Sequence, residues 1–133
     1  MTDDEFLAAF EACTLPRPEW THEAHVRMAW LYFTRLPAAA AADRIRVGIR
    51  RYNASVGSDG YHETITVAFA RVIAARVRGG ESFTDFRDRE PDLFDRKSSA
   101  LLRYYSDTLL HSPAAKLEFV EPDREPLPDY PGE

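Results

Sequence analysis

The chain has 133 residues, of which 44% are hydrophobic and 29% are charged, and its formal net charge is −5 at pH 7. This length fits one domain with a core of its own, and the composition is that of a globular protein rather than a disordered, collagen-like or membrane protein. The single cysteine excludes an internal disulfide and a cysteine-based zinc site, and it fits a reducing compartment.

The negative charge is concentrated in the second part of the chain. Residues 81–133 hold 13 acidic and 7 basic side chains, against 9 and 10 in residues 1–80. This balance argues against general nucleic-acid binding, which depends on neutralising phosphates. The N-terminus lacks the basic and apolar regions of a secretion signal, and no apolar stretch approaches the roughly 20 residues of a membrane span. We therefore expect a cytoplasmic protein that has neither nucleic acid nor membrane as a partner.

The first part of the chain predicts three helices. Thr2 and Glu5 have the spacing of a capping box, and apolar residues then recur at helical intervals. Thr21 is a suitable N-cap for a second helix. Pro37 closes that helix and can occupy the first turn of a third, which Gly57 ends. The predicted helices cover about residues 3–13, 22–36 and 37–56.

The second part predicts a fourth helix and several short ones. The fourth runs from about Tyr61 to Arg78, where two glycines end it. Short helices are expected after Ser82, after Ser98 or Ser99 as far as Tyr105, and after Ser112.

The last 13 residues differ from the rest. From Glu121 the chain holds four of its nine prolines and shows no apolar periodicity, so an extended tail is expected. The predicted fold is therefore all-α. It consists of a single domain of six or seven helices over residues 1–120, followed by an extended Pro-rich tail over residues 121–133.

Three of the four histidines lie near predicted helix starts and point inward. At about 100° per residue, His22 and His25 fall within the apolar face of the second helix. His62 falls within the apolar face of the fourth helix, with Thr66 one turn further along. If these faces meet near their N-terminal ends, the three imidazoles converge. The i, i+3 spacing of His22 and His25 brings two rings within about one helical turn, a separation that one metal ion can bridge.

Three histidines around an ion with open coordination positions are typical of a catalytic metal site. The predicted ligands are His22, His25 and His62, and the predicted cofactor is a divalent zinc or iron ion. Glu63 is a candidate general base or accessory ligand beside His62, and Thr66 would orient the His62 ring. The order His-Glu-Ala-His is one residue shorter than the zinc-protease motif, which excludes that class.

Four further side chains are candidates for substrate binding. Arg76 falls inside the apolar arc of the fourth helix, where it either clamps a substrate carboxylate or forms a buried ion pair with one of the C-terminal acids. Aromatic side chains near the histidines either wall a pocket or belong to the core. The candidates are Trp30, Tyr61, Thr66 and Arg76.

The residues leave three functions open. The first is a metal-dependent enzyme that acts on a small organic molecule. The second is a metal-free acid–base enzyme that uses the same histidine cluster. The candidate catalytic residues are His62 and Glu63. The third is a non-catalytic helical binding or interaction module with structural histidines, whose Pro-rich tail docks a partner. The expected partner is a small-molecule ligand, and a homodimer is left open.

Two histidine-containing segments carry a resemblance. Residues 19–30, with the run WTHEAH, and residues 60–66, with the run YHETIT, resemble segments of a group of small bacterial all-helical proteins. The resemblance extends to residues 119–123 and 126–128. It implies a helical bacterial domain and carries no reaction type.

Overall fold

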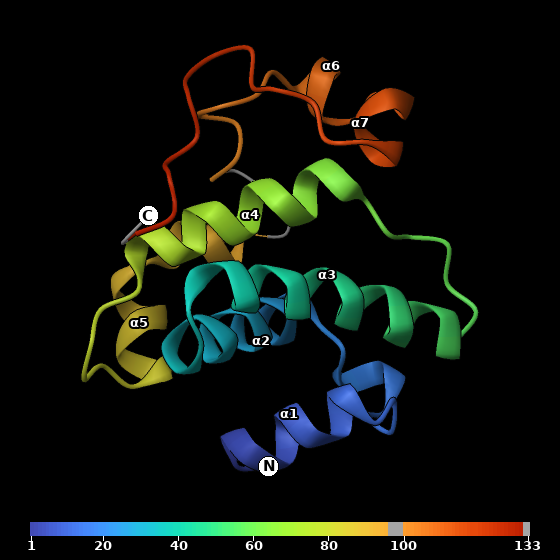
Figure 1. Ribbon diagram of the computed structural model, residues 1–133, viewed down its shortest axis with the longest axis vertical. Helices are drawn as coiled ribbons and strands as arrows, with labels where there is room; N and C mark the ends of the chain where they lie inside the picture. Colours follow the sequence, from blue (N-terminus) through green and yellow to red (C-terminus); the bar gives the residue numbers. More distant parts are fainter. Residues whose placement is uncertain (96–99, 132–133) are drawn as a thin grey trace.

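Helices make up the regular structure of this chain (Figure 1). The computed structural model describes residues 1–95 and 100–131. Within these residues it contains seven α-helices, two short 3₁₀ helices and no strand, which confirms the predicted all-α class. The elements are α1 (Asp3–Glu11), η1 (Arg17–Glu19), α2 (His22–Arg35), α3 (Ala38–Ser55), α4 (Glu63–Arg76), α5 (Phe83–Arg89), η2 (Pro91–Phe94), α6 (Asp107–Leu110) and α7 (Pro113–Leu117).

The predicted caps define most helix starts. Thr2 and Glu5 form the capping box of α1, because each side chain bonds the other's backbone N–H. Thr21 accepts a hydrogen bond from the backbone N–H of Ala24 and so caps α2. Ser82 and Ser112 cap α5 and α7 in the same way. These helix starts were therefore predictable from local side-chain chemistry.

The long helices α2, α3 and α4 pack against one another, and α1 covers α2 and α3 on the side away from α4 (Figure 1). Gly48 of α3 permits this contact, because a Cβ atom there would lie 2.6 Å from the ring of Phe10 of α1. Phe10 itself is fully buried. The Tyr52 hydroxyl donates to the carbonyl of Leu15 over 2.8 Å, which ties the loop after α1 to α3.

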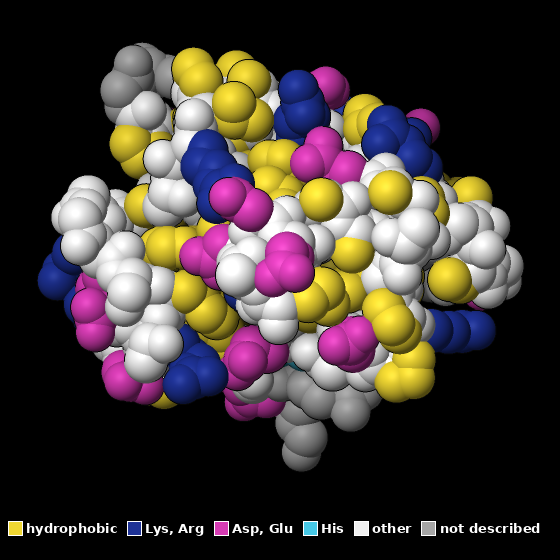
Figure 2. All heavy atoms as spheres, turned by 90° about the horizontal axis from the view of Figure 1, so that it is seen from below, with side chains coloured by type: hydrophobic (Ala, Val, Ile, Leu, Met, Phe, Trp, Pro, Cys, Tyr) yellow, Lys and Arg dark blue, Asp and Glu magenta, His cyan; other side chains and the backbone are white. Residues whose placement is uncertain are grey.

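Ion pairs connect α1 to the helices that it covers. Arg27 of α2 lies 2.7 Å from Asp3, and Arg44 of α3 lies 3.4 Å from Glu11. Figure 2 shows the face on this side of the molecule, where acidic, basic and apolar side chains are intermingled. Partly exposed pairs of this kind each contribute little to stability.

Two helix predictions need correction. The fourth helix begins at Glu63 and ends at Arg76, so it is shorter at both ends than the predicted 61–78. Ser98 and Ser99, the predicted start of another helix, lie outside the described residues. The chain then forms turns over residues 100–104 instead of a helix, and the four-residue helix α6 follows behind Ser106 as its cap.

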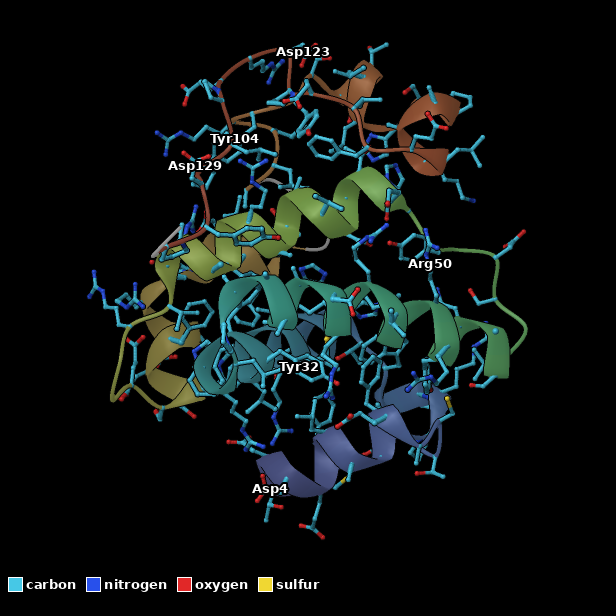
Figure 3. The ribbon with its side chains drawn as sticks, in the orientation of Figure 1. Asp4, Tyr32, Arg50, Tyr104, Asp123 and Asp129 are labelled. Carbon is cyan, nitrogen blue, oxygen red and sulfur yellow. The ribbon has the colours of Figure 1, made fainter. Side chains whose placement is uncertain are left out.

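As far as residue 131, where the described part ends, the C-terminal segment has no helix after α7, but it packs on the helices. Thr64 of α4 donates to the carbonyl of Glu118 and accepts from the N–H of Val120. Arg71 donates to the carbonyl of Pro128 over 3.0 Å, and Figure 3 shows Asp129 beside the C-terminal half of α4. Leu127 is buried in the main core. Residues 121–131 form no helix, and the side chain of Leu127 contributes to the core of the domain.

No helix in the described part of the chain is both long and apolar enough to cross a lipid bilayer.

Candidate functional site

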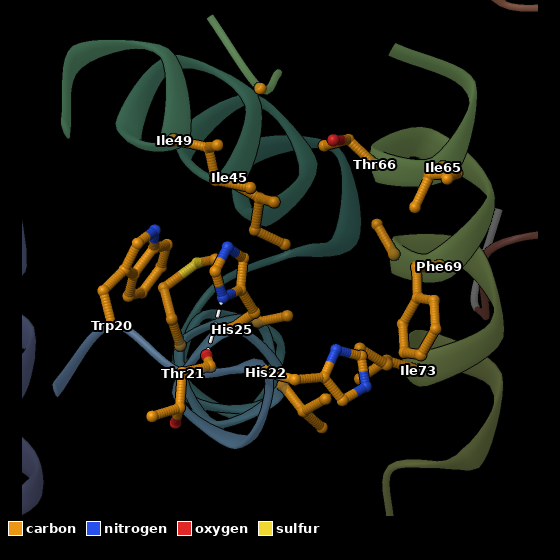
Figure 4. Close-up of a pocket in the computed structure, with 15 residues that line it drawn as sticks. Trp20, Thr21, His22, His25, Ile45, Ile49, Ile65, Thr66, Phe69 and Ile73 are labelled. Carbon is orange, nitrogen blue, oxygen red and sulfur yellow. Dashed lines mark hydrogen bonds between the residues drawn. The ribbon is translucent and has the colours of Figure 1, made fainter. Parts of the chain in front are cut away.

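A cavity of about 820 Å³ lies between α2, α3 and α4 (Figure 4). Its walls are largely aliphatic and aromatic. Small side chains on the facing helices, Ala29 of α2 and Ala70 of α4, also line it and leave space between the helices. A concave space with mostly apolar walls and a few polar groups is the usual form of a small-molecule site. The larger apolar side chains of the wall include Ile45, Ile49, Ile65, Phe69 and Ile73.

His25 is one of the few polar groups in this cavity. Its Nδ1 atom lies 2.7 Å from the carbonyl oxygen of Thr21. A carbonyl only accepts hydrogen bonds, so Nδ1 carries the proton. Burial lowers the pKa of His25, outweighing the opposing effect of the hydrogen bond to Thr21. The ring is therefore neutral at pH 7, and its Nε2 atom carries a lone pair.

The Nε2 atom of His25 faces the cavity. Figure 4 shows it on the side of the ring away from Thr21, towards Ile45 and Ile49 of α3. It has no hydrogen-bond partner among residues 1–95 and 100–131. The ring is held in place by stacking on Trp20, with centroids 3.8 Å apart, and Trp20 stacks in turn on Phe10 at 4.8 Å.

His22 uses its two ring nitrogens in the opposite way to His25. Its Nε2 atom lies 2.8 Å from the carbonyl oxygen of Leu93 in η2, so Nε2 carries the proton. The ring meets Phe69 of α4 edge-on, at a centroid distance of 5.6 Å. In the neutral ring Nδ1 carries the lone pair, and within the described residues Nδ1 has no hydrogen-bond partner. Two histidines of α2 thus present one acceptor nitrogen each.

His62 does not join them. It is the N-cap of α4, where its Nδ1 atom accepts a hydrogen bond from the N–H of Ile65 over 3.0 Å. Its Nε2–H donates to the carbonyl of Leu110 over 2.9 Å. Burial lowers the pKa of His62. Both nitrogens are occupied, so no lone pair is left for a metal ion, and His62 does not line the cavity.

The expected three-histidine metal site is therefore not assembled. Among the described residues, no group of three or more His, Cys, Asp and Glu side chains could hold a metal ion. The physical reason is that His62 is turned towards α6 by its two hydrogen bonds. His22 and His25 offer at most two nitrogens, which do not fit the three protein ligands of a catalytic zinc site.

Glu63 is held by an ion pair and does not face the cavity. Its carboxylate accepts hydrogen bonds from Arg46, with Nε at 3.2 Å, and from the Tyr61 hydroxyl. Arg50 (Figure 3) lies 3.7 Å from the same carboxylate and covers the Tyr61 ring. Burial acts to raise the pKa of Glu63, but the hydrogen bonds from Arg46 and Tyr61 outweigh it, so that pKa is lowered. The roles predicted for Glu63 as base and for Tyr61 as substrate contact are not supported.

The remaining candidates are divided. Thr66 lines the cavity on α4, opposite α2 (Figure 4). Trp30 lies elsewhere, with its buried ring near Phe83 of α5 at a centroid distance of 5.5 Å. Arg76 forms ion pairs with Glu90 at 3.1 Å and Asp92 at 2.7 Å, the structural alternative that the sequence left open. Of the four predicted substrate-binding residues, Thr66 lines the cavity, and Trp30, Tyr61 and Arg76 do not.

Sequence reasoning did not name Ile45 and Ile49 of α3, although they form one wall of the site. They lie on the apolar stripe of that helix and carry no chemical signal of their own. The usable signal was the pair of alanines, Ala29 and Ala70, on helix faces that pack together. Small residues there leave volume that larger neighbours do not fill.

Comparison with known proteins adds no assignment. No family model, no curated protein and no solved structure matches this chain. The resemblance of residues 19–30 and 60–66 to bacterial proteins stays a prediction, and any function must be argued from the site itself.

Proposed function

We propose that this protein binds a small, largely apolar organic molecule between α2, α3 and α4, and that His22 and His25 accept hydrogen bonds from it. The observation that carries the proposal is the pair of imidazoles. Each uses one nitrogen on a backbone carbonyl, at 2.8 Å for His22 and 2.7 Å for His25. The other nitrogen of each has no partner among the described residues and can meet a ligand.

The chemistry of the cavity selects for a hydrogen-bond donor. The wall offers dispersion contacts and burial to an apolar body. An imidazole acceptor that loses water without gaining a donor is penalised, by about 1–3 kcal/mol for a buried polar group. A ligand with a hydroxyl or N–H group is therefore preferred over an analogue of the same shape without one.

Acid–base catalysis is a second candidate for the same site. The lowered pKa of His25 keeps its ring neutral at pH 7. A neutral imidazole that a carbonyl holds in one tautomer can take a proton from a bound, weakly acidic group. In this form of the proposal His25 is the base and His22 positions the substrate.

The test compares 2-naphthol with 2-methoxynaphthalene, which has the same ring system and no donor. Isothermal titration of the tag-free protein should give 2-naphthol a dissociation constant about 3- to 10-fold lower, as one hydrogen bond contributes. Because 2-naphthol has a single donor, its hydroxyl binds one of the two rings, and either His22→Ala or His25→Ala should reduce this preference. His111→Ala is the control, since His111 is exposed on the opposite side of α4 from the cavity wall. Equal binding of both compounds, or an unchanged preference in both cavity variants, would overturn the proposal.

Metal binding by the three histidines stays a prediction, and zinc titration separates it from the proposal. Because both nitrogens of His62 are occupied, we expect His62→Asn to leave the zinc affinity of the tag-free protein unchanged. Stoichiometric zinc that is lost in both His22→Ala and His62→Asn would instead support the three-histidine site.

A further inference from the structure

A second hollow adjoins the cavity. It has a volume of about 290 Å³ and shares Trp20, His25 and Gly60 with the larger cavity. Beyond these shared residues its lining changes character, because it includes Arg17, Asn53 and Ser58. The stacked rings of Trp20 and His25, 3.8 Å apart, mark the boundary between the two spaces. A ligand in the larger cavity can therefore extend past His25 into polar surroundings.

The polar hollow contains one cationic side chain, and within the described residues no carboxylate pairs with it. Arg17 lies in η1 and forms no ion pair with any residue of 1–95 or 100–131. Arg44, Arg46 and Arg50 of α3, by contrast, are all paired with glutamates.

No acidic side chain lines either space. The acids nearest to the hollow along the chain, Glu19 and Asp59, are exposed and belong to neither lining. Asn53 adds an amide that can donate to an anion, and its side chain makes no hydrogen bond to another described residue.

We infer that the ligand is an amphipathic organic acid, with an apolar body in the cavity and a carboxylate at Arg17. This inference rests on the proposed function, because it adds an anionic group to the same ligand. A guanidinium presents a planar fork of donors that matches a carboxylate, and Asn53 can supply a further donor. The hydroxyl or N–H group of the ligand meets His22, which lines the larger cavity and not the hollow, at the end of the molecule away from the carboxylate.

The experiment uses three related probes and measures dissociation constants by isothermal titration. They are 6-hydroxy-2-naphthoate, which has both groups at opposite ends, 2-naphthol, which has the donor alone, and 2-naphthoate, which has the acid alone. We expect 6-hydroxy-2-naphthoate to bind about 5-fold more tightly than 2-naphthol, a modest gain because Arg17 is exposed. Raising the ionic strength to about 0.5 M should remove most of this gain.

Matched variants locate the effect. Arg17→Gln should weaken 6-hydroxy-2-naphthoate about 5-fold and leave 2-naphthol unchanged. Arg78→Gln removes the same charge from an exposed position after α4 that lines neither space, and it should change neither constant. If 6-hydroxy-2-naphthoate binds no better than 2-naphthol, or if the two variants behave alike, the inference is overturned while the proposed function stands. If none of the three probes binds, the proposed function fails as well.

Discussion

The start of α2 and the start of α4 use histidine in opposite ways. At the start of α4, the His62 ring accepts from its own helix and donates to Leu110, so it connects α4 to α6. At the start of α2, His22 and His25 each bind one carbonyl and keep one nitrogen for the cavity. All three rings point inward and are partly buried. Inward direction alone therefore does not identify a site, whereas counting the partners of each nitrogen does.

The residue that caps each helix explains the difference. In α2 the hydroxyl of Thr21 caps the helix by accepting from the N–H of Ala24, so the histidines are not needed for this purpose. At the start of α4 the residue before the histidine is Tyr61, whose hydroxyl donates to Glu63 and does not cap the helix. The cap must then come from His62 itself. A threonine at one helix start thus leaves two imidazoles available for a ligand.

The largest predicted effect comes from replacing the histidine at the start of α4. His62→Ala removes the cap and leaves the carbonyl of Leu110 without its donor, so we expect the free energy of unfolding to fall by about 2–3 kcal/mol. His62→Asn keeps a capping side chain and should recover about 1 kcal/mol. Urea unfolding followed by circular dichroism measures both.

His25→Ala gives the matched change at α2. The carbonyl of Thr21 also accepts from the backbone N–H of residue 25, at 3.0 Å, and this bond survives the substitution. We expect a loss of about 1 kcal/mol, mainly from stacking on Trp20. A loss in His25→Ala as large as that in His62→Ala would contradict the division into a structural histidine and two site histidines.

Much of the fold was predictable because it depends on local patterns. The apolar periodicity of α2 and α3 and the caps Thr2 and Thr21 are properties of short segments. The C-terminal segment was less accessible. Its contacts with Thr64 join residues more than 50 positions apart, and Thr64 carries no pattern that announces them.

The site was predictable only in part, because the start of the fourth helix was placed two residues too early. The sequence placed the start of the fourth helix at Tyr61, which makes His62 a residue of the helix face. The helix in fact begins at Glu63, so His62 is its cap, and its ring is bonded to Ile65 and Leu110. Helix ends are the least certain part of any pattern, and this shift separated His62 from His22 and His25.

A further effect is expected from the aromatic support of the cavity. The side chain added in Gly48→Ala would lie 2.6 and 2.9 Å from two ring atoms of Phe10, which is fully buried. Overpacking should lower the free energy of unfolding by up to about 2 kcal/mol, after the better helix propensity of alanine is included. Because Phe10 stacks on Trp20, the fluorescence of Trp20 should also shift, measured in a Trp30→Phe background.

Gly79→Ala is the control for this change. A Cβ atom at Gly79 meets no atom within 4 Å, so we expect neither a loss of stability nor a shift in fluorescence. If Gly48→Ala unfolds at the same urea concentration as Gly79→Ala and leaves the Trp20 signal unchanged, α1 does not support the His25 side of the cavity.

The smallest effect is a pH dependence. In the free protein, His25 and His62 should both contribute to the pH dependence of stability. In contrast, His25 and not His62 should contribute to the pH dependence of ligand affinity. Burial lowers the pKa values of His25 and His62 below the 6.5 of the unfolded chain. The unfolded state therefore binds protons first as the pH falls, and the contribution of the two histidines to the free energy of unfolding, constant above about pH 7.5, decreases below pH 6.5. The slope is limited to about 1.4 kcal/mol per pH unit for each histidine.

Binding separates the two contributions. A donor such as 2-naphthol holds His25 in its neutral form, so its affinity should weaken once the pH falls below the pKa of His25 in the folded protein. His62→Asn should flatten the pH dependence of stability and leave the pH dependence of 2-naphthol affinity unchanged. If His62→Asn alters the affinity profile instead, the two helix starts are coupled. The ring that caps α4 would then take part in binding despite having both nitrogens occupied.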